Sequence, residues 1–126
     1  MFDKIFGGDR FVAQTRAIDA ASLRHQVIAH NLSNANTPNY KRQDVLFESQ
    51  LSQALAQDSR GGSHACAKVQ AQIVTQNTTS TRLDGNNVDL EAESVALAEN
   101  TLRYEVLSQN VGGYFGALKN VINGGR

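Results

Sequence analysis

The side chains that most often carry chemistry are few in this sequence and poorly spaced for it. His25 and His30 are five residues apart, which on a helix separates them by roughly 140°, so the two rings cannot face one metal ion. His64 stands in a Gly-rich stretch. Cys66 is the single cysteine, which excludes an internal disulfide and a multi-thiolate zinc site. We therefore expect these histidines to be surface or interface residues.

The run from Asp84 to Asp89 is only partly like a calcium-binding loop. Val88 stands where such a loop needs an oxygen ligand, and the twelfth position is Val95 rather than Glu. The sequence also lacks a phosphate-binding Gly-rich loop and a nucleophile elbow. It therefore predicts no catalytic residues, no cofactor and no metal, and it favours a structural protein over an enzyme. A small enzyme that uses Cys66 as a nucleophile stays open as an alternative.

Composition limits the partners. The 126 residues are enough for one domain, and 12 Lys and Arg balance 12 Asp and Glu. This neutrality argues against nucleic acid as a partner, because phosphate neutralisation needs a concentrated basic face. No apolar run approaches the roughly 18 residues that span a bilayer. The first residues lack the apolar core of a cleaved signal peptide, so we expect neither a membrane span nor signal cleavage.

The first predicted element is a helix over residues 10–35. This stretch has no Gly or Pro, and its apolar residues recur at steps of three or four, although many of them are Ala. Such a thin stripe favours a helix that packs on partner helices, with a surface helix on a small core as the alternative. An Asn-rich turn ends it, because proline disfavours helix at the preceding residue and Asn tolerates positive φ. The turn motif consists of Asn31, Asn34, Asn36, Thr37, Pro38, Asn39 and Tyr40.

The middle of the chain has shorter signals. Phe47, Leu51 and Leu55 recur every four residues and predict a short helix over residues 47–57. Alternation over residues 69–73 predicts a strand, which residues 75–78 could turn back into a second strand over residues 79–83. A lobe this small needs support from the flanking helices or from neighbouring molecules.

The last zone predicts a long helix with Asp89 as its N-cap. Gly112 and Gly113 are expected to interrupt this helix, through tight packing, a bend or fraying. The residues between 84 and 105 include six acids and one base, whereas residues 10–30 carry three Arg and one Asp. These opposite charges favour packing of the last helix on a first helix, in the same chain or the next. A seven-residue repeat predicts a coiled-coil-like seam of Leu90, Leu97, Tyr104, Val111 and Leu118, with mixed companions at Ser94, Thr101, Ser108, Phe115 and Ile122.

The predicted fold class is mainly α. Long N- and C-terminal helices pair in a coiled-coil-like bundle, and a small middle lobe contains a β-hairpin and a short helix. The predicted divisions are an N-terminal helical segment (1–37), the middle lobe with the turn (38–85) and a C-terminal helix (86–126).

Two separated motifs resemble one known family. The stretch His30–Lys41, an Asn-rich helix end that runs into Thr-Pro-Asn-Tyr, is similar to the N-terminal signature of bacterial flagellar rod and hook proteins. Asn39 stands where that family usually has Gly. The later run Asp84–Glu91 and the segment Leu97–Tyr104 resemble the short proximal branch of the family more than FlgC, the neighbouring short rod protein.

The resemblance implies a structural subunit of the flagellar basal body in the periplasmic rod. Its terminal helices would form the inner layer of a hollow drive shaft, which transmits torque and conducts exported subunits. The implied partners are further copies of itself, other rod proteins of the FlgC and FlgF type, the FliE adaptor, the inner-membrane MS ring and the type III export apparatus, through which it would pass unfolded. A cytosolic helical adaptor or type III secretion chaperone stays open as an alternative.

Overall fold

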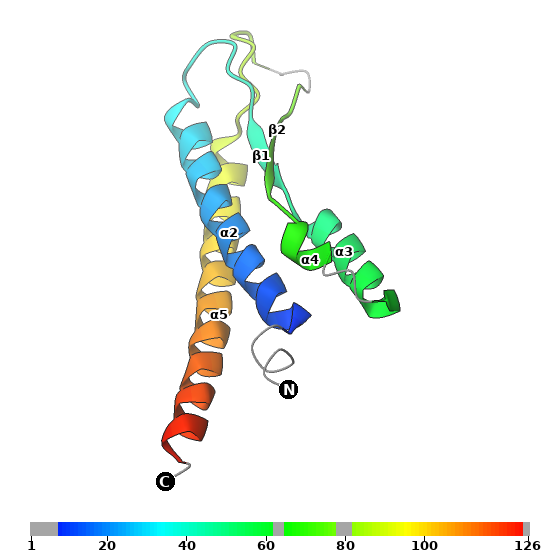
Figure 1. Ribbon diagram of the computed structural model, residues 1–126. Helices are drawn as coiled ribbons and strands as arrows, with labels where there is room; N and C mark the ends of the chain where they lie inside the picture. Colours follow the sequence, from blue (N-terminus) through cyan, green and yellow to red (C-terminus); the bar gives the residue numbers. More distant parts are fainter. Residues whose placement is uncertain (1–7, 62–64, 78–81, 125–126) are drawn as a thin grey trace.

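The computed structural model describes residues 8–61, 65–77 and 82–124, and it contains one long helix near each end of the chain with a small lobe between them (Figure 1). In chain order the elements are α2 (Asp9–Ser33), β1 (Gln43–Leu46), α3 (Glu48–Gly61), α4 (Ala65–Lys68), β2 (Gln72–Thr75) and α5 (Leu90–Asn123). Within these ranges no helix has an apolar stretch long enough to cross a bilayer.

The two long helices pack side by side and run in opposite directions (Figure 1). The helix predicted over residues 10–35 is confirmed as α2, and the last helix is confirmed as α5. With 34 residues against 25, α5 is the longer helix, and its last turns extend beyond the start of α2 (Figure 1). The predicted pairing of the terminal helices therefore occurs within one chain.

The middle lobe contains the predicted short helix and two antiparallel strands. The short helix is α3, which begins and ends slightly later than residues 47–57. One strand, β2, forms close to the predicted 69–73, but its partner is β1, with Gln43 opposite Thr75 and Leu46 opposite Gln72. The predicted second strand lies largely outside the described residues, since 79–81 are not described and Arg82 and Leu83 form a bend and a turn. The pairing therefore joins segments on either side of α3 and α4.

The lobe folds against α2, which supplies part of its core. Ala20 and Val27 of α2 pack with buried side chains from the lobe, namely Val45, Phe47, Ala54, Cys66 and Val69. The small alanines of α2 let the lobe approach the helix closely, which explains why the apolar stripe of α2 looks thin in the sequence. The expectation that the lobe needs a flanking helix agrees with this core.

The glycine pair in α5 does not interrupt the helix. The helix runs unbroken from Leu90 to Asn123 through Gly112 and Gly113. A Cβ atom built on either glycine would meet nothing within 4 Å. The expected interruption is therefore wrong, and so is tight packing of these glycines within the single chain.

Candidate assembly interface

The turn that follows α2 adopts the backbone conformation its sequence predicts. Asn39 has a φ of 61°, in the left-handed region where Asn is among the best tolerated residues after Gly. Inside the turn, the Thr37 hydroxyl donates to Asn34 Oδ1 (3.2 Å), and Asn34 Nδ2 donates to the carbonyl of His30 (2.9 Å). Asn36 and Pro38 are exposed. The side chains of this turn therefore stabilise the end of the helix.

The second sequence motif docks directly on this turn. Asn86, which has no exposed surface, points Nδ2 at the carbonyl oxygens of Asn34 (2.9 Å), Ala35 (3.0 Å) and Thr37 (2.9 Å). Its Oδ1 accepts from the backbone N–H of Val88 (2.8 Å). One buried amide therefore satisfies carbonyl groups freed where α2 ends and holds them against the start of α5.

Backbone contacts bring the two motifs into close approach. The N–H of Asn39 donates to the carbonyl of Asp84 (2.8 Å), and Lys41 Nζ donates to the carbonyl of Gly85 (2.7 Å). Gly85 has a φ of 76°, and a Cβ atom there would lie 2.6 Å from Asn39 Oδ1. The hydrogen bond from the N–H of Asn86 lowers the pKa of Asp84 below its usual value. The positive φ and this close approach therefore both favour glycine at residue 85.

A buried polar cluster lies beneath the turn. Asn31 uses both amide atoms: Nδ2 donates to the carbonyl of Gln43 (2.8 Å) and to Glu93 Oε2 (3.1 Å), and Oδ1 accepts from Tyr40 Oη (3.1 Å) and the N–H of Gln43 (3.0 Å). Glu93 has no exposed surface, and its other oxygen accepts a hydrogen bond from Arg42 Nε. Burial, with the charge of Glu93, raises the pKa of Tyr40. This cluster joins α2, β1 and α5.

Asp89 occupies the N-cap of α5. Its Oδ1 accepts from the backbone N–H of Glu91 (2.9 Å) and of Ala92 (3.2 Å). Glu91 and Glu93 lie in the first turn of the helix, where the helix dipole favours negative charge. The cap fixes the residue at which α5 begins and hence which side of the helix faces α2.

The side of α5 that is most buried is displaced from the predicted seam. Of the five seam residues, Leu97, Val111 and Leu118 are half-buried, whereas Leu90 is 50% exposed and Tyr104 is 43% exposed. The predicted companions are mostly exposed, with only Thr101 half-buried. A different row of α5 packs toward α2. Its residues lie three positions after seam residues and repeat every seven residues: Glu93, Asn100, Leu107 and Tyr114.

Two contacts anchor this inward side of α5. Asn100, 2% exposed, donates from Nδ2 to the carbonyl of Ala21 (2.8 Å). At the other end of α2, Phe11 stacks on Tyr114 with ring centroids 4.8 Å apart and meets Phe115 edge-on at 5.7 Å. The contact between α2 and α5 is therefore polar toward the turn that follows α2 and aromatic near the first residues of α2.

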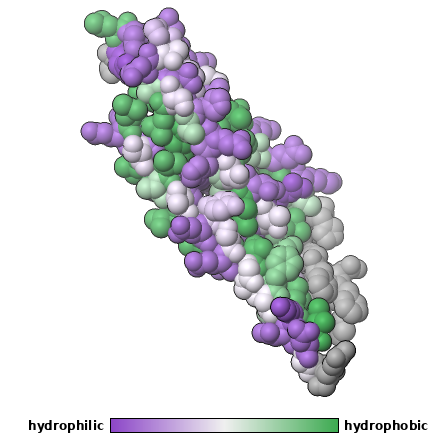
Figure 2. Space-filling view, turned by 90° about the vertical axis from the view of Figure 1, so that its left-hand side faces the viewer, coloured by the Kyte–Doolittle hydropathy of each residue, from purple (hydrophilic) through white to green (hydrophobic). Residues whose placement is uncertain are grey.

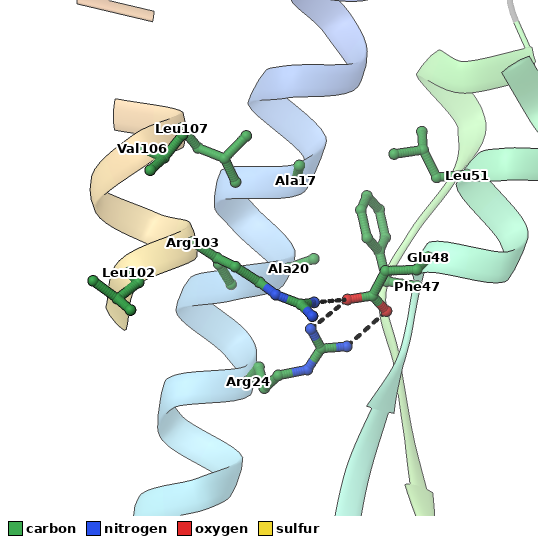
Figure 3. Close-up of a pocket in the computed structure, with 11 residues that line it drawn as sticks. Ala17, Ala20, Arg24, Phe47, Glu48, Leu51, Leu102, Arg103, Val106 and Leu107 are labelled. Atoms are coloured by element: carbon green, nitrogen blue, oxygen red, sulfur yellow. Dashed lines mark hydrogen bonds and ion pairs between the residues drawn. The ribbon is translucent and has the colours of Figure 1, made fainter. Parts of the chain in front are cut away.

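An ion-paired cluster closes the side of this helix pair. Arg24 of α2 binds both carboxylate oxygens of Glu48 in α3, with Arg24 Nη2 2.7 Å from Glu48 Oε2, and Arg103 of α5 donates to Glu48 Oε1 (3.0 Å) (Figure 3). The hydrogen bond from Arg24 lowers the pKa of Glu48 and raises that of Arg24. Among the described residues the two long helices are thus linked through α3, with one base from each helix bound to the same acid, and not by ion pairs between acids of α5 and bases of α2.

A groove of roughly 470 Å³ opens beside this cluster. Its floor is formed by alanines of α2, and its walls carry Phe47 and Leu51 on one side and Leu102 and Val106 on the other (Figure 3). The lining side chains are mainly apolar. The groove is therefore suited to receiving apolar side chains.

The residues considered first for chemistry do not converge. His25 Nδ1 lies 3.4 Å from Asn100 Nδ2, His30 is exposed, and Cys66 is buried in the lobe core. His64 lies outside the described residues. The described part of the chain holds no group of three or more His, Cys, Asp or Glu side chains that could bind a metal ion. What the geometry does offer is a rigid helix pair, a locked junction and an open groove.

Known proteins resemble this chain over the segments that form the junction and over most of the rest of its length. A family described as "Flagella basal body rod protein" matches residues 12–41, which span α2 and the turn. The flagellar basal body rod protein FlgB of Bacillus subtilis is 34% identical over 87% of this chain and 90% of its own length. FlgB of Escherichia coli is 30% identical over 99% of both chains, and FlgB of Yersinia ruckeri is 30% identical over 99% of this chain and all of its own.

The chain belongs to the FlgB family. A member of this family is a structural subunit of the flagellar basal body rod, so the resemblance of the two motifs to the rod and hook proteins is confirmed. The comparisons give no support to the cytosolic adaptor or secretion chaperone.

Sequence reasoning found both motifs of this FlgB-family chain but missed the residues that join them. The sequence places Asn86 inside the Asp84–Glu91 motif without assigning it a role, and it does not single out Arg42, Glu93 or Asn100. A signal for two of them was available. Glu93 and Asn100 are seven residues apart and three residues after seam positions, a place where a polar residue must have a buried partner.

Proposed function

We propose that this chain forms the proximal part of the flagellar rod by polymerising through α2 and α5. Each subunit contributes its helix pair to the inner layer of a hollow shaft, and the middle lobe packs outside. The shaft transmits torque and conducts exported subunits. The chain itself catalyses no reaction, because its role is carried by helix contacts.

The observation that carries this proposal is the apolar surface that the helix pair leaves open. On α5, Val95, Leu102 and Val106 are 59%, 63% and 57% exposed, although they occupy a helix already packed along another side. Figure 2 shows apolar side chains interspersed with polar ones along one face of the molecule. A helix pair with apolar residues on its outer side has the surface of an incomplete bundle, which further helices complete.

The partners follow from this placement. We propose contacts with further copies of the chain, with rod proteins of the FlgC and FlgF type, with the FliE adaptor and with the inner-membrane MS ring. Delivery is through the type III export apparatus as an unfolded chain, without cleavage of a signal peptide. Support comes from FlgB-family membership and from a lobe small enough to refold after passage.

Isolation of basal bodies tests the proposal. A strain that lacks this protein should be non-motile and should yield basal bodies without a rod, and the restored chain should co-purify with basal bodies at its full length. Motility without the protein, or a restored chain found only in the cytosol, would contradict the proposal. A Cys66→Ala variant should support normal motility, and its failure would revive a role for the thiol.

A further inference from the structure

The C-terminal end of α5 carries an apolar side that continues past α2. Phe11 is two residues from the first residue of α2 and contacts Tyr114 and Phe115. Beyond that level, Val121 is 77% exposed and Ile122 is 71% exposed. Phe115 and Ile122 are seven residues apart and so lie on one side of the helix, in the row next to the one that packs on α2. Within the described residues, this side has no helix to pack on.

This end of the helix also has a defined charge. From residue 106 to residue 126 the chain has no acidic residue and two bases, Lys119 and Arg126. Lys119 and Asn123 lie on the flank of the side that bears Phe115 and Ile122, one helical turn apart. Lys119 is exposed and makes no ion pair with another described residue. The end therefore offers apolar side chains flanked by hydrogen-bond donors.

The groove beside the Glu48 cluster offers the complementary set. Its apolar part is lined by the alanines of α2 and by Phe47, Leu51, Leu102 and Val106 (Figure 3). A second, polar hollow of roughly 420 Å³ shares Arg24, Glu48 and Arg103 with it and so continues it.

Two residues that line the polar hollow each have an acceptor without a partner among the described residues. Asn100 Oδ1 is buried without a hydrogen bond, an arrangement that costs free energy unless a donor arrives. Glu99 is exposed at the same hollow and makes no ion pair with another described residue. The groove therefore combines an apolar wall with two acceptors that need donors.

We propose that the C-terminal turns of α5 in one copy dock in this groove of a second copy. Ile122 and Phe115 fill the apolar part, and Lys119 and Asn123 supply the donors for Glu99 and Asn100. The groove and the helix end lie at different places on the chain, so the contact is heterologous and repeats from copy to copy, which builds a closed ring or an open helix. The inference rests on the proposed rod function and specifies one of its contacts.

Cysteine cross-linking in basal bodies tests the contact. Two chains are expressed together in one strain, one carrying Leu51→Cys in the groove and the other Ile122→Cys at the helix end, and isolated basal bodies are treated with a short thiol cross-linker. The expected product is a covalent dimer that neither variant gives alone. The matched control replaces Ile122→Cys with Gln109→Cys, which is exposed on another side of α5 and should give no dimer.

A charge exchange gives a second measurement. Glu99→Lys and Lys119→Glu should each reduce motility and the dimer yield, and the double variant should recover both, because the ion pair is restored with its signs reversed. A double variant that is no better than the worse single variant would overturn the proposed pair.

The outcomes separate the two proposals. Absence of the unsubstituted chain from basal bodies would refute the rod function. If the unsubstituted chain is present but the two cysteines give no dimer, the groove contact is wrong and the rod function stands. An Ile122→Cys chain that links to a different rod component, or only within its own copy, likewise overturns the docking of a second copy.

Discussion

At the scale of single residues, a few buried amides hold together segments that are far apart in the sequence. Asn31 and Asn86 have no exposed surface, and each contacts a segment remote from its own. Buried amides are stabilising only when their hydrogen bonds are satisfied, so their positions tolerate few other residue types. This constraint accounts for the asparagines at positions 31 and 86.

The first prediction concerns Asn86. Asn86→Ala removes the donor to the carbonyls of Asn34, Ala35 and Thr37 and leaves buried acceptors unsatisfied, at a cost of about 1–3 kcal/mol. Urea unfolding of the purified subunit, followed by circular dichroism, should show this loss. Asn36→Ala is the control, because Asn36 is exposed. Equal stability of the two variants would contradict the role of Asn86.

The second prediction concerns the backbone at Asn39. Because its φ is 61°, Asn39→Gly should be tolerated, whereas Asn39→Val places a β-branched residue in the left-handed region at a cost of about 1–2 kcal/mol or more. Swimming in soft agar and the amount of subunit in basal bodies should fall for the valine variant alone. If both variants swim equally well, the turn does not need this conformation for assembly.

At the scale of elements, the helices and the pairing of the two long ones were predictable from the sequence, whereas the pairing of the strands was not. Residue composition and periodicity are local signals, and they located both long helices and the short one. The partner of β2 depends on contacts across α3 and α4, and the buried polar cluster at Arg42 and Asn31 helps to hold β1 in place. Likewise, the seven-residue repeat predicted the row of seam residues along α5. It did not predict that the polar residues Glu93 and Asn100 occupy the neighbouring row, which packs on α2.

The third prediction concerns the link between α2, α3 and α5. Glu48 has a lowered pKa in the folded chain, so its ion pairs stabilise the fold above its unfolded pKa of about 4.3 and lose this effect as pH falls through the lower folded value. Glu48→Gln should therefore unfold more easily than the unsubstituted chain at pH 7. The difference should disappear in acid, below the folded pKa.

Because Glu48 is half exposed, this effect is expected to be small, and thermal unfolding at several pH values is the suitable measurement. Glu105→Gln is the matched control, since Glu105 is exposed in the middle of α5 and lies outside the cluster. A constant difference between Glu48→Gln and the unsubstituted chain from neutral to acid pH would show that charge does not carry the link.

At the scale of the whole molecule, the chain is a long, narrow unit. The buried polar contacts that join its two long helices are concentrated at one end. The junction of the two motifs and the buried cluster lock α2 to α5 at the turn (Figure 1). The opposite end of α5 carries exposed apolar residues. A subunit built in this way has one rigid end and one end that gains contacts from its neighbours, as a structural subunit of a rod requires.

The fourth prediction tests the helix pair as the unit of assembly. Leu97 is half-buried on α5, so Leu97→Asp places a charge where the helix pair and its neighbours exclude water, at a cost of about 2–5 kcal/mol. Every copy in the rod carries the same defect, so growth of the shaft should stop. Glu105→Gln is the control: Glu105 is exposed on α5 and lies outside both the row that packs on α2 and the row of Val95 and Leu102, so this variant should leave motility intact.

Export should persist in the Leu97→Asp strain, because the export route we propose accepts an unfolded chain and does not read the packed helix pair. The expected result is therefore a subunit detectable outside the cytoplasm, basal bodies without a completed rod and no swimming. Normal swimming would show that this side of α5 is not needed for the rod. Retention of the variant in the cytoplasm would instead place Leu97 in the export step, so fractionation of the cells decides between a failure of assembly and a failure of delivery.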